Sequence, residues 1–210
     1  MKIGMIGLGR MGLNMARRLA RGGIEVAAYN RTVQKAKDFA AEEGKNASAA
    51  ETLAELVALL PTPRVVWLML PAGAATDEHI EELLPLLASG DTIVDGGNTY
   101  FRDDQRRHAT AGKCGIRYCD AGVSGGIWGL AEGYCIMRTS SGCCSYIQAL
   151  ANAAAKGANS ASISMPAMKP TISATAFLLP SLSIPLRYDT NAFMGKTLRA
   201  SAMVASFIRP

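Results

Sequence analysis

A glycine-rich segment near the start of the chain restricts the possible fold more than any other feature of the sequence. The six residues of a G-x-G-x-x-G pattern are Gly7, Leu8, Gly9, Arg10, Met11 and Gly12. An apolar, strand-like run (Lys2–Gly7) leads into the pattern, and helical spacing over Met11–Arg21 follows it. Glycines at these spacings allow a tight turn, close approach of a pyrophosphate to the backbone, and close packing of a helix on a sheet. Because a helix N-terminus also offers free N–H groups to phosphates, the segment predicts dinucleotide binding.

Up to Met137 the chain alternates between strand-like and helix-like segments. Strands are expected at Lys2–Gly7, Glu25–Tyr29, Arg64–Leu70, Thr92–Asp95 and Ile116–Ala121. Helices are expected at Met11–Arg21, Val33–Glu43, Ala49–Leu60, Thr76–Ala88 and Phe101–Ala111. Strands separated by helical patterns imply βαβ units, whose crossovers are right-handed. The sequence therefore predicts the α/β class, with a doubly wound, Rossmann-like parallel sheet.

The composition changes after Met137, so we expect a dinucleotide-binding domain over residues 1–137 and a tail over residues 138–210. The first part carries 15 Lys and Arg against 16 Asp and Glu, whereas the tail carries 7 Lys and Arg against one acid, Asp189. Between Ser160 and Pro185 no helical or strand period persists, which predicts an irregular or disordered tail. Because the tail keeps apolar residues that disordered segments usually lack, a shifted reading frame is a second interpretation.

The net charge of +5 does not indicate a nucleic-acid partner. The excess comes from the shortage of carboxylates in the tail, with no Lys and Arg cluster interleaved with aromatic residues. No apolar run approaches the roughly 18 residues that span a bilayer, and no signal-peptide pattern follows Met1. We therefore expect a cytoplasmic protein without a membrane partner. The cysteines and histidines show no metal-site spacing, so we expect no metal.

The end of the second expected strand indicates which dinucleotide is bound. Where an NAD site usually places a carboxylate for the ribose 2′-hydroxyl, this chain has Asn30, Arg31 and Thr32. Arg31 offers a forked cation to a 2′-phosphate, and Glu25 lies at the opposite end of the strand. A solvated arginine ahead of a helix capped by Thr32 would use the same residues. The pattern favours NADP, with NAD as the alternative.

Two further glycine-containing segments follow expected strands, at the edge where α/β sheets bind ligands. One is Asp95–Thr99, in which the Asn98 amide can both donate and accept hydrogen bonds. The other contains Ser124, Gly125 and Gly126. Either segment alone is consistent with a simple tight turn. Their shared position favours contact with a substrate.

Taken together, these segments resemble the decarboxylating 6-phosphogluconate dehydrogenases, within the wider β-hydroxyacid dehydrogenase group. The matching stretches are GLGRMG at 7–12, NRT at 30–32, LPAG at 70–73, DGGN at 95–98, VSGGIWG at 123–129 and EGYCIM at 132–137. DGGN and the longer VSGG stretch favour the phosphogluconate enzymes over other members of the group. The Ile127-Trp128-Gly129 form resembles a shorter bacterial branch, some of whose members use NAD and carry an acid near position 30.

The resemblance implies oxidative decarboxylation of 6-phosphogluconate, a sugar-acid phosphate, to ribulose 5-phosphate with NADP in the pentose phosphate pathway. It also implies a family of homodimers or larger assemblies. The implied cofactor contacts are Gly7, Leu8, Gly9, Arg10, Met11, Gly12, Asn30, Arg31, Thr32, Leu70, Pro71, Ala72 and Asn98. The implied substrate contacts are Asn98, Ser124, Gly125 and Gly126.

The sequence departs from the family where the family has its catalytic base and acid. The resemblance implies a lysine base and a glutamate acid in a G-x-G-H-x-x-K-x-x-H-N-x-x-E-Y stretch that opens an all-helical domain. That stretch is absent here: no His-Asn pair occurs, and no glutamate follows Glu132. We assign no catalytic residue, and we hypothesise that residues 138–210 arise from a frameshift in a gene for such an enzyme. The alternatives are a dehydrogenase of the 3-hydroxyisobutyrate type and a non-catalytic NADP-binding fragment.

Overall fold

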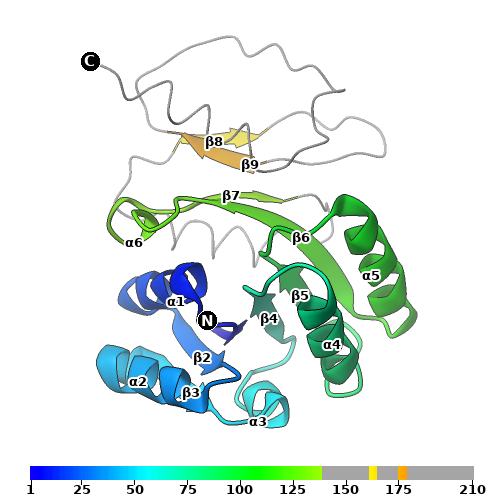
Figure 1. The fold of residues 1–210 in the computed structure, drawn as a ribbon, viewed down its shortest axis with the longest axis horizontal. Coiled ribbons are helices and arrows are strands. Elements are labelled where there is room, and N and C mark those ends of the chain that lie inside the picture. The colour runs from blue at the N-terminus through cyan, green and yellow to red at the C-terminus, as the bar shows by residue number, and fades with distance from the viewer. Residues whose placement is uncertain (139–160, 165–174, 179–210) are drawn as a thin grey trace.

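A twisted sheet of seven strands forms the centre of the computed structural model, which describes residues 1–138, 161–164 and 175–178 (Figure 1). The strands are β1 (Lys2–Ile6), β2 (Glu25–Tyr29), β3 (Ala47–Ala50), β4 (Val65–Leu68), β5 (Thr92–Asp95), β6 (Arg117–Ser124) and β7 (Cys135–Arg138). They lie in the order β3-β2-β1-β4-β5-β6-β7, and all pairs are parallel except β6 with β7. This order defines a doubly wound dinucleotide-binding sheet, so the predicted fold class is confirmed.

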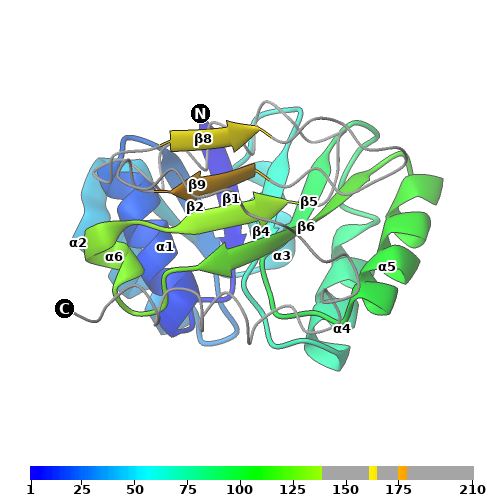
Figure 2. The same cartoon turned by 90° about the horizontal axis from the view of Figure 1, so that it is seen from above.

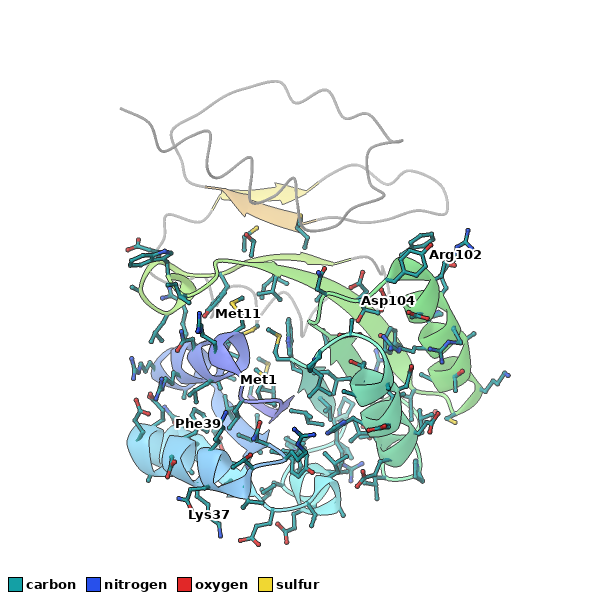
Figure 3. All side chains as sticks on the ribbon, viewed as in Figure 1. Met1, Met11, Lys37, Phe39, Arg102 and Asp104 are labelled. Carbon is teal, nitrogen blue, oxygen red and sulfur yellow. The ribbon has the colours of Figure 1, made fainter. Side chains whose placement is uncertain are left out.

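Helices cover both faces of the sheet. They are α1 (Arg10–Arg21), α2 (Val33–Glu43), α3 (Leu53–Ala58), α4 (Ala74–Leu83), α5 (Phe101–Lys113) and the short α6 (Gly129–Glu132), with a 3₁₀ turn η1 at Gly44–Asn46. Alternate strand residues enter two separate cores. Met5 and Trp67 pack with the inward residues of α1 and α2, among them Phe39, which is labelled in Figure 3. Val66 packs with the inward residues of α3, α4 and α5. A parallel sheet buried on both faces explains the strongly apolar strands.

The segment around residue 50 differs from the expected third helix over Ala49–Leu60. Residues 47–50 instead form the edge strand β3, which pairs with β2, and the helix is limited to Leu53–Ala58. The helix begins where the Thr52 hydroxyl accepts a hydrogen bond from the Glu55 N–H at 3.1 Å, while the Glu55 carboxylate accepts one from the Glu51 N–H. The first bond is that of an N-cap, and the second comes from the residue before the N-cap. The local sequence Thr-Leu-Ala-Glu at 52–55 carried this signal.

The far end of the sheet also extends beyond the sequence prediction. Strand β6 continues past Ala121 to Ser124 and pairs with the antiparallel strand β7, which the sequence did not predict (Figure 2). Val123 and Ser124 are therefore strand residues that pair with Ile136 and Cys135, and only Gly125 and Gly126 follow the strand as a turn. The sequence analysis placed Ser124 after the strand, whereas Ser124 is the last residue of β6.

Two short strands occur within the tail that was predicted to be irregular. They are β8 (Ala161–Ser164) and β9 (Thr175–Leu178), which pair in antiparallel fashion. The rest of residues 139–210 lies outside the described part of the chain, so the structure does not test the frameshift hypothesis. The expected domain boundary at Met137 falls within strand β7, and the structure does not test that boundary either. Within the described ranges, no helix is long and apolar enough to cross a membrane.

Candidate functional site

Strand register brings four of the predicted binding segments to one edge of the sheet. The last residue of β1, Ile6, pairs with Tyr29 at the end of β2 and with Leu68 at the end of β4. Leu68 in turn pairs with Asp95 at the end of β5. The loops that begin directly after these four residues therefore leave the sheet side by side, at its carboxyl edge. This is the edge at which open α/β sheets bind their ligands, and it includes the β1/β4 boundary where the strand order reverses.

The glycine loop between β1 and α1 has the geometry of a phosphate cradle. Gly7 has φ +93°, and a methyl group there would meet the Met69 carbonyl oxygen. A methyl group at Gly12 would collide with the Gly7 carbonyl oxygen, so the helix packs against the loop only with glycine at this position. At Gly9, by contrast, an added Cβ meets no atom within 4 Å. Gly9 is the N-cap of the twelve-residue helix α1, whose first turn contains no acid. The open space therefore faces free N–H groups.

Asn30 ties the glycine loop to the turn between β2 and α2. Its Oδ1 accepts a hydrogen bond from the Leu8 N–H at 2.9 Å, and its Nδ2 donates to the Thr32 carbonyl at 3.1 Å. The Gly7 N–H also donates to the Tyr29 carbonyl at 3.0 Å. Asn30 therefore shapes the loop as well as standing in the predicted cofactor set. Its role follows from contacts 22 residues apart, which sequence spacing alone did not specify.

The turn after β2 carries an exposed cation, and no acid lies in the first turn of the helix that follows it. The cation is Arg31, and Thr32 beside it is also exposed. A hollow of 360 Å³ beside Gly9 is lined by Arg10 and Lys35, among other residues. Within residues 1–138, no hydrogen bond or ion pair engages the side chains of Arg10, Arg31 or Lys35. Lys35 was not predicted from the sequence, although it lies about one helical turn after Arg31.

Two acidic side chains line the same hollow, and one of them is paired with a cation. The Glu42 carboxylate is paired with Arg17, and the Asp38 carboxylate accepts a hydrogen bond from Gln34 at 2.8 Å. Gln34 is neutral, so Asp38 keeps its charge, but Arg10 and Lys35 outnumber it. The net charge beside the glycine loop is therefore positive, which suits a phosphate group.

The loop after β4 contains the predicted residues Leu70, Pro71 and Ala72. Its fold depends on the Pro71 carbonyl, which accepts a hydrogen bond from the Thr76 hydroxyl at 2.9 Å, and on Gly73, which caps α4 with φ +95°. Pro71 and Ala72 are exposed at the carboxyl edge. The loop lies against the next one, because a methyl group on Gly97 would come within 2.8 Å of the Leu70 carbonyl oxygen.

A buried carboxylate, Asp95, shapes the loop after β5 that carries Asn98. Asp95 Oδ1 accepts from the Gly97 N–H at 2.8 Å, and Oδ2 accepts from the Thr99 and Tyr118 hydroxyls at 2.8 and 3.0 Å. Burial raises the pKa of the Tyr118 phenol, and the nearby Asp95 carboxylate raises it further, so Tyr118 keeps its proton and donates it. Asn98 itself is exposed at the tip of this loop. The motif Asp-Gly-Gly-Asn thus contains one residue that shapes the loop and one that faces the solvent.

The sequence analysis missed the counterion of Asp95, which is Arg107 on α5. The Arg107 side chain is 2% exposed, and its guanidinium lies 3.3 Å from Asp95 and 2.8 Å from Asp77. The hydrogen bond from Arg107 holds the pKa of Asp77 below its ordinary value. The inward spacing of Asp104, Arg107 and Ala111 on α5 was the available signal. Asp104 lies on that side of the helix and accepts from the Tyr118 hydroxyl at 3.1 Å (Figure 3).

The remaining predicted residues lie beyond the edge that the other four loops share. They are Ser124, Gly125 and Gly126. Asp120 pairs with Asp95, and β6 then runs four residues further before it ends at Ser124. A methyl group on Gly125 would come within 2.8 Å of the Tyr134 ring, and one on Gly129 would collide with that ring. Packing under Tyr134 therefore accounts for two of the glycines in this segment without any ligand.

Arg18 joins this last segment to the cofactor-side helix α1. It is a buried residue of α1 that donates to the Leu130 and Ala131 carbonyls of α6 at 2.8 and 3.1 Å. Cations at the C-terminal end of a helix stabilise its unpaired carbonyls. The turn at Gly125–Gly126 is thus attached to the first helix of the domain.

The sheet order, the glycine loop and the row of loops at the carboxyl edge define the dinucleotide-binding domain of an oxidoreductase. The family model described as "NAD binding domain of 6-phosphogluconate dehydrogenase" matches residues 2–161. The chain belongs to this family. The predicted resemblance to 6-phosphogluconate dehydrogenase is thereby confirmed for its NAD-binding domain.

Individual relatives agree with this assignment. The chain is 44% identical over 137 residues to the NADP(+)-dependent, decarboxylating 6-phosphogluconate dehydrogenase of Bacillus subtilis (strain 168). The aligned region is 65% of this chain and 29% of that protein. The chain therefore spans less than a third of the length of this relative.

Solved structures show the same fold in two branches of the wider group. Plasmodium falciparum 6-phosphogluconate dehydrogenase, which was solved in its apo form and in complexes with its cofactor NADP+ and its substrate 6-phosphogluconate, matches with a TM-score of 0.69 and 32% identity. The match covers 76% of this chain and 35% of that one. Mycobacterium tuberculosis 3-hydroxyisobutyrate dehydrogenase matches with a TM-score of 0.65 and 26% identity, over 73% of this chain and 52% of that one.

Proposed function

We propose that the chain binds NADP and supplies the cofactor-binding part of an enzyme that oxidatively decarboxylates 6-phosphogluconate to ribulose 5-phosphate. The observation that carries the cofactor proposal is the open cradle at Gly9 beside Arg10, Arg31 and Lys35, which have no partner among the described residues, with no acid in the first turn of α1 or α2. When bound, NADP would supply the acceptor for a hydride from the sugar acid. The protein's own residues bind and orient it.

The proposed contacts place the adenosine half of the cofactor at the loops after β1 and β2, and the nicotinamide half at the loops after β4 and β5. The backbone of Gly7–Gly12 and the N-terminus of α1 would hold the pyrophosphate. Arg31 and Thr32, with Asn30 holding the turn, would hold the adenosine ribose phosphate. Leu70, Pro71 and Ala72 would line the cofactor further along the edge. Asn98 would lie at the nicotinamide end, where it would also reach the substrate.

Preference for NADP over NAD follows from the charge at the end of β2. A titration of the purified chain with both dinucleotides tests it, and we expect NADP to bind more tightly. Arg31→Ala should lower NADP affinity by about ten-fold or more and leave NAD affinity unchanged, because only NADP carries the 2′-phosphate. Arg102→Ala is the matched control, since Arg102 is an exposed arginine on α5, far from α2 (Figure 3). Equal affinity of the unaltered chain for NAD and NADP would contradict the proposal.

The substrate proposal rests on Asn98, Ser124, Gly125 and Gly126, together with the 6-phosphogluconate dehydrogenase family assignment. The structural match to a 3-hydroxyisobutyrate dehydrogenase supports the alternative of a simpler β-hydroxy acid. Binding of 6-phosphogluconate and of 3-hydroxyisobutyrate to the NADP-loaded chain, measured by calorimetry, separates these two. Binding heat with 6-phosphogluconate but not with 3-hydroxyisobutyrate supports the 6-phosphogluconate proposal.

A third candidate function is that of a module that binds NADP and catalyses no oxidation. No glutamate follows Glu132 and no His-Asn pair occurs in the 210 residues, so they contain neither the base nor the acid of the family's catalytic stretch. We expect NADP binding with no NADPH formed from 6-phosphogluconate. Turnover at an ordinary enzymatic rate would show that other residues do this chemistry.

The frameshift proposal for residues 138–210 has its own test. Sequencing of the coding DNA across codons 130–210 and translation of all three frames should reveal the G-x-G-H-x-x-K-x-x-H-N stretch in another frame. Its absence from every frame would identify the tail as a genuine segment and would favour the module without turnover.

A further inference from the structure

Arg107 contacts two loops that leave the sheet from different strands. Its Nη2 donates to the Gly73 carbonyl, in the loop after β4, at 3.3 Å. Its Nη1 donates to the Asp95 carboxylate and to the Thr99 hydroxyl, at the two ends of the loop after β5, at 3.3 Å each. Its Nε donates to Asp77 on α4 at 2.8 Å. One buried guanidinium thus joins residues up to 34 positions away in the sequence.

Each of the two loops also has hydrogen bonds of its own, which do not involve the other loop. The loop after β4 is held at Pro71 by Thr76, within its own helix entrance. The loop after β5 is held by Asp95 through Gly97 and Thr99. The two loops approach closely where a methyl group on Gly97 would come within 2.8 Å of the Leu70 carbonyl oxygen. Arg107 adds a polar link that reaches both loops.

A lysine would not reproduce these contacts. The planar guanidinium directs its N–H groups at fixed angles to Gly73, Asp95 and Asp77 simultaneously, whereas an ammonium is a single point charge. The neighbouring Arg106 shares the partner Asp77, but its side chain is 57% exposed and it contacts neither loop. Two consecutive arginines on α5 thus share one partner, and only one of them joins the loops.

We propose that Arg107 is a positioning residue that sets the spacing between the loop Leu70–Gly73 and the loop Asp95–Thr99, and so shapes the place where the nicotinamide half of the cofactor binds. The inference rests on the proposed function, which places Asn98 at that end. Arg107 lies beneath the loops and does not touch the cofactor. Its effect is preorganisation of the groups that do.

The first test is hydrogen exchange in the full chain without ligand, comparing Arg107→Lys with Arg106→Lys. We expect backbone amides of both loops to exchange at least about ten-fold faster in Arg107→Lys, and the amides of Gly7–Gly12 to stay unchanged. Arg106→Lys should leave all three segments unchanged. Equal acceleration in all three segments would show a general loss of stability, and no acceleration would show that the link does not hold the loops. Either result overturns the proposal.

The second test separates the two halves of the cofactor. Adenosine 2′,5′-bisphosphate carries only the adenosine half, whereas the emission of bound NADPH reports on the nicotinamide ring. Arg107→Lys should bind the bisphosphate within about two-fold of the unaltered chain and lose most of the NADPH emission change. An emission change equal to that of the unaltered chain overturns the proposal. If the unaltered chain binds neither compound, the proposed function fails instead, and this inference fails with it.

A second variant covers the outcome in which Arg107→Lys does not fold. Thr99→Val removes the hydroxyl that accepts from Arg107 and donates to Asp95, and it keeps every charge. We expect faster exchange confined to Asp95–Thr99 and a smaller loss of the NADPH emission change. Exchange and emission equal to those of the unaltered chain would overturn the proposal.

Discussion

The two halves of the carboxyl edge are built in opposite ways. In the first half, β1-α1-β2, the loops are shaped by backbone groups and by missing side chains: Gly7 and Gly12 are required because a methyl group would strike a carbonyl oxygen. Arg10 and Arg31 beside these loops are exposed, and Arg17 on α1 pairs with Glu42. In the second half, β4-α4-β5-α5-β6, the loops are held by a buried network centred on Asp95 and Arg107, whose side chains are 0% and 2% exposed.

This difference indicates which substitutions each half of the edge tolerates. A site formed by backbone groups depends on local residues and fails when an atom is added. A site held by buried charges depends on partners distant in the sequence and fails when an atom is removed, because a charge left without its partner in the interior is costly. Deleting a buried charge should therefore act on the second half, and adding a methyl group should act most strongly at Gly12, where the new atom would come closest to a carbonyl oxygen.

The largest effect is expected from breaking the buried pair. Asp95→Asn leaves the Arg107 guanidinium without its fully buried counterion, and should lower the free energy of unfolding by about 3 kcal/mol in urea denaturation. Asp103→Asn, on the exposed side of α5, should cost less than about 0.5 kcal/mol. A change below about 1 kcal/mol for Asp95→Asn would show that the second half does not depend on this charge.

The next effect comes from adding one methyl group to the first half. Gly12→Ala forces the α1 backbone away from the Gly7 carbonyl, and should lower the free energy of unfolding by about 2 kcal/mol. Gly112→Ala is the matched control, because Gly112 lies near the end of α5 with no atom within 4 Å of an added Cβ. Alanine is a better helix former than glycine, so this variant should gain about 0.5 kcal/mol. Similar losses in both variants would contradict the account of the glycine loop.

The smallest effect on the free energy of unfolding is expected at Asp77, the more exposed partner of Arg107, and it should depend on pH. Since Arg107 lowers the pKa of Asp77 in the folded state, the Asp77 carboxylate stabilises the fold above its unfolded pKa of about 3.9. The contribution is lost as pH falls through the lower, folded pKa. Asp77→Asn should cost about 1 kcal/mol at pH 7, and the difference from the unaltered chain should shrink in acid. A pH-independent difference in urea denaturation would contradict this assignment.

Sequence reasoning succeeded where structure is determined locally. It predicted β2, β5 and α2 with the bounds that the structure shows, because each is a run of consistent periodicity between turn residues. It missed β3, since Ala47–Ala50 contains no β-branched or aromatic residue and becomes a strand only by pairing with β2. The strand β7 was missed for a similar reason: it is defined by its pairing with β6.

The same division applies to the candidate site. The glycine loop and the turn at Asn30–Thr32 could be predicted, because their residues are adjacent in the sequence. The role of Arg107 could not, because nothing in the local sequence distinguishes it from Arg106 except its inward position on the helix. The packing of Gly125 and Gly129 under Tyr134 also depends on how β6 and β7 fold back on each other. Contacts of this kind follow from tertiary structure alone.

The most direct test of the central claim, that the glycine loop binds the phosphates of NADP, is a calorimetric titration of NADP into the unaltered chain and Gly9→Ala. A methyl group at Gly9 meets no protein atom within 4 Å, so it should change the free energy of unfolding by less than about 1 kcal/mol. It would occupy the space left for the pyrophosphate, and NADP affinity should fall by at least about ten-fold. Equal NADP affinity in both proteins, or no NADP binding by the unaltered chain, would contradict the claim.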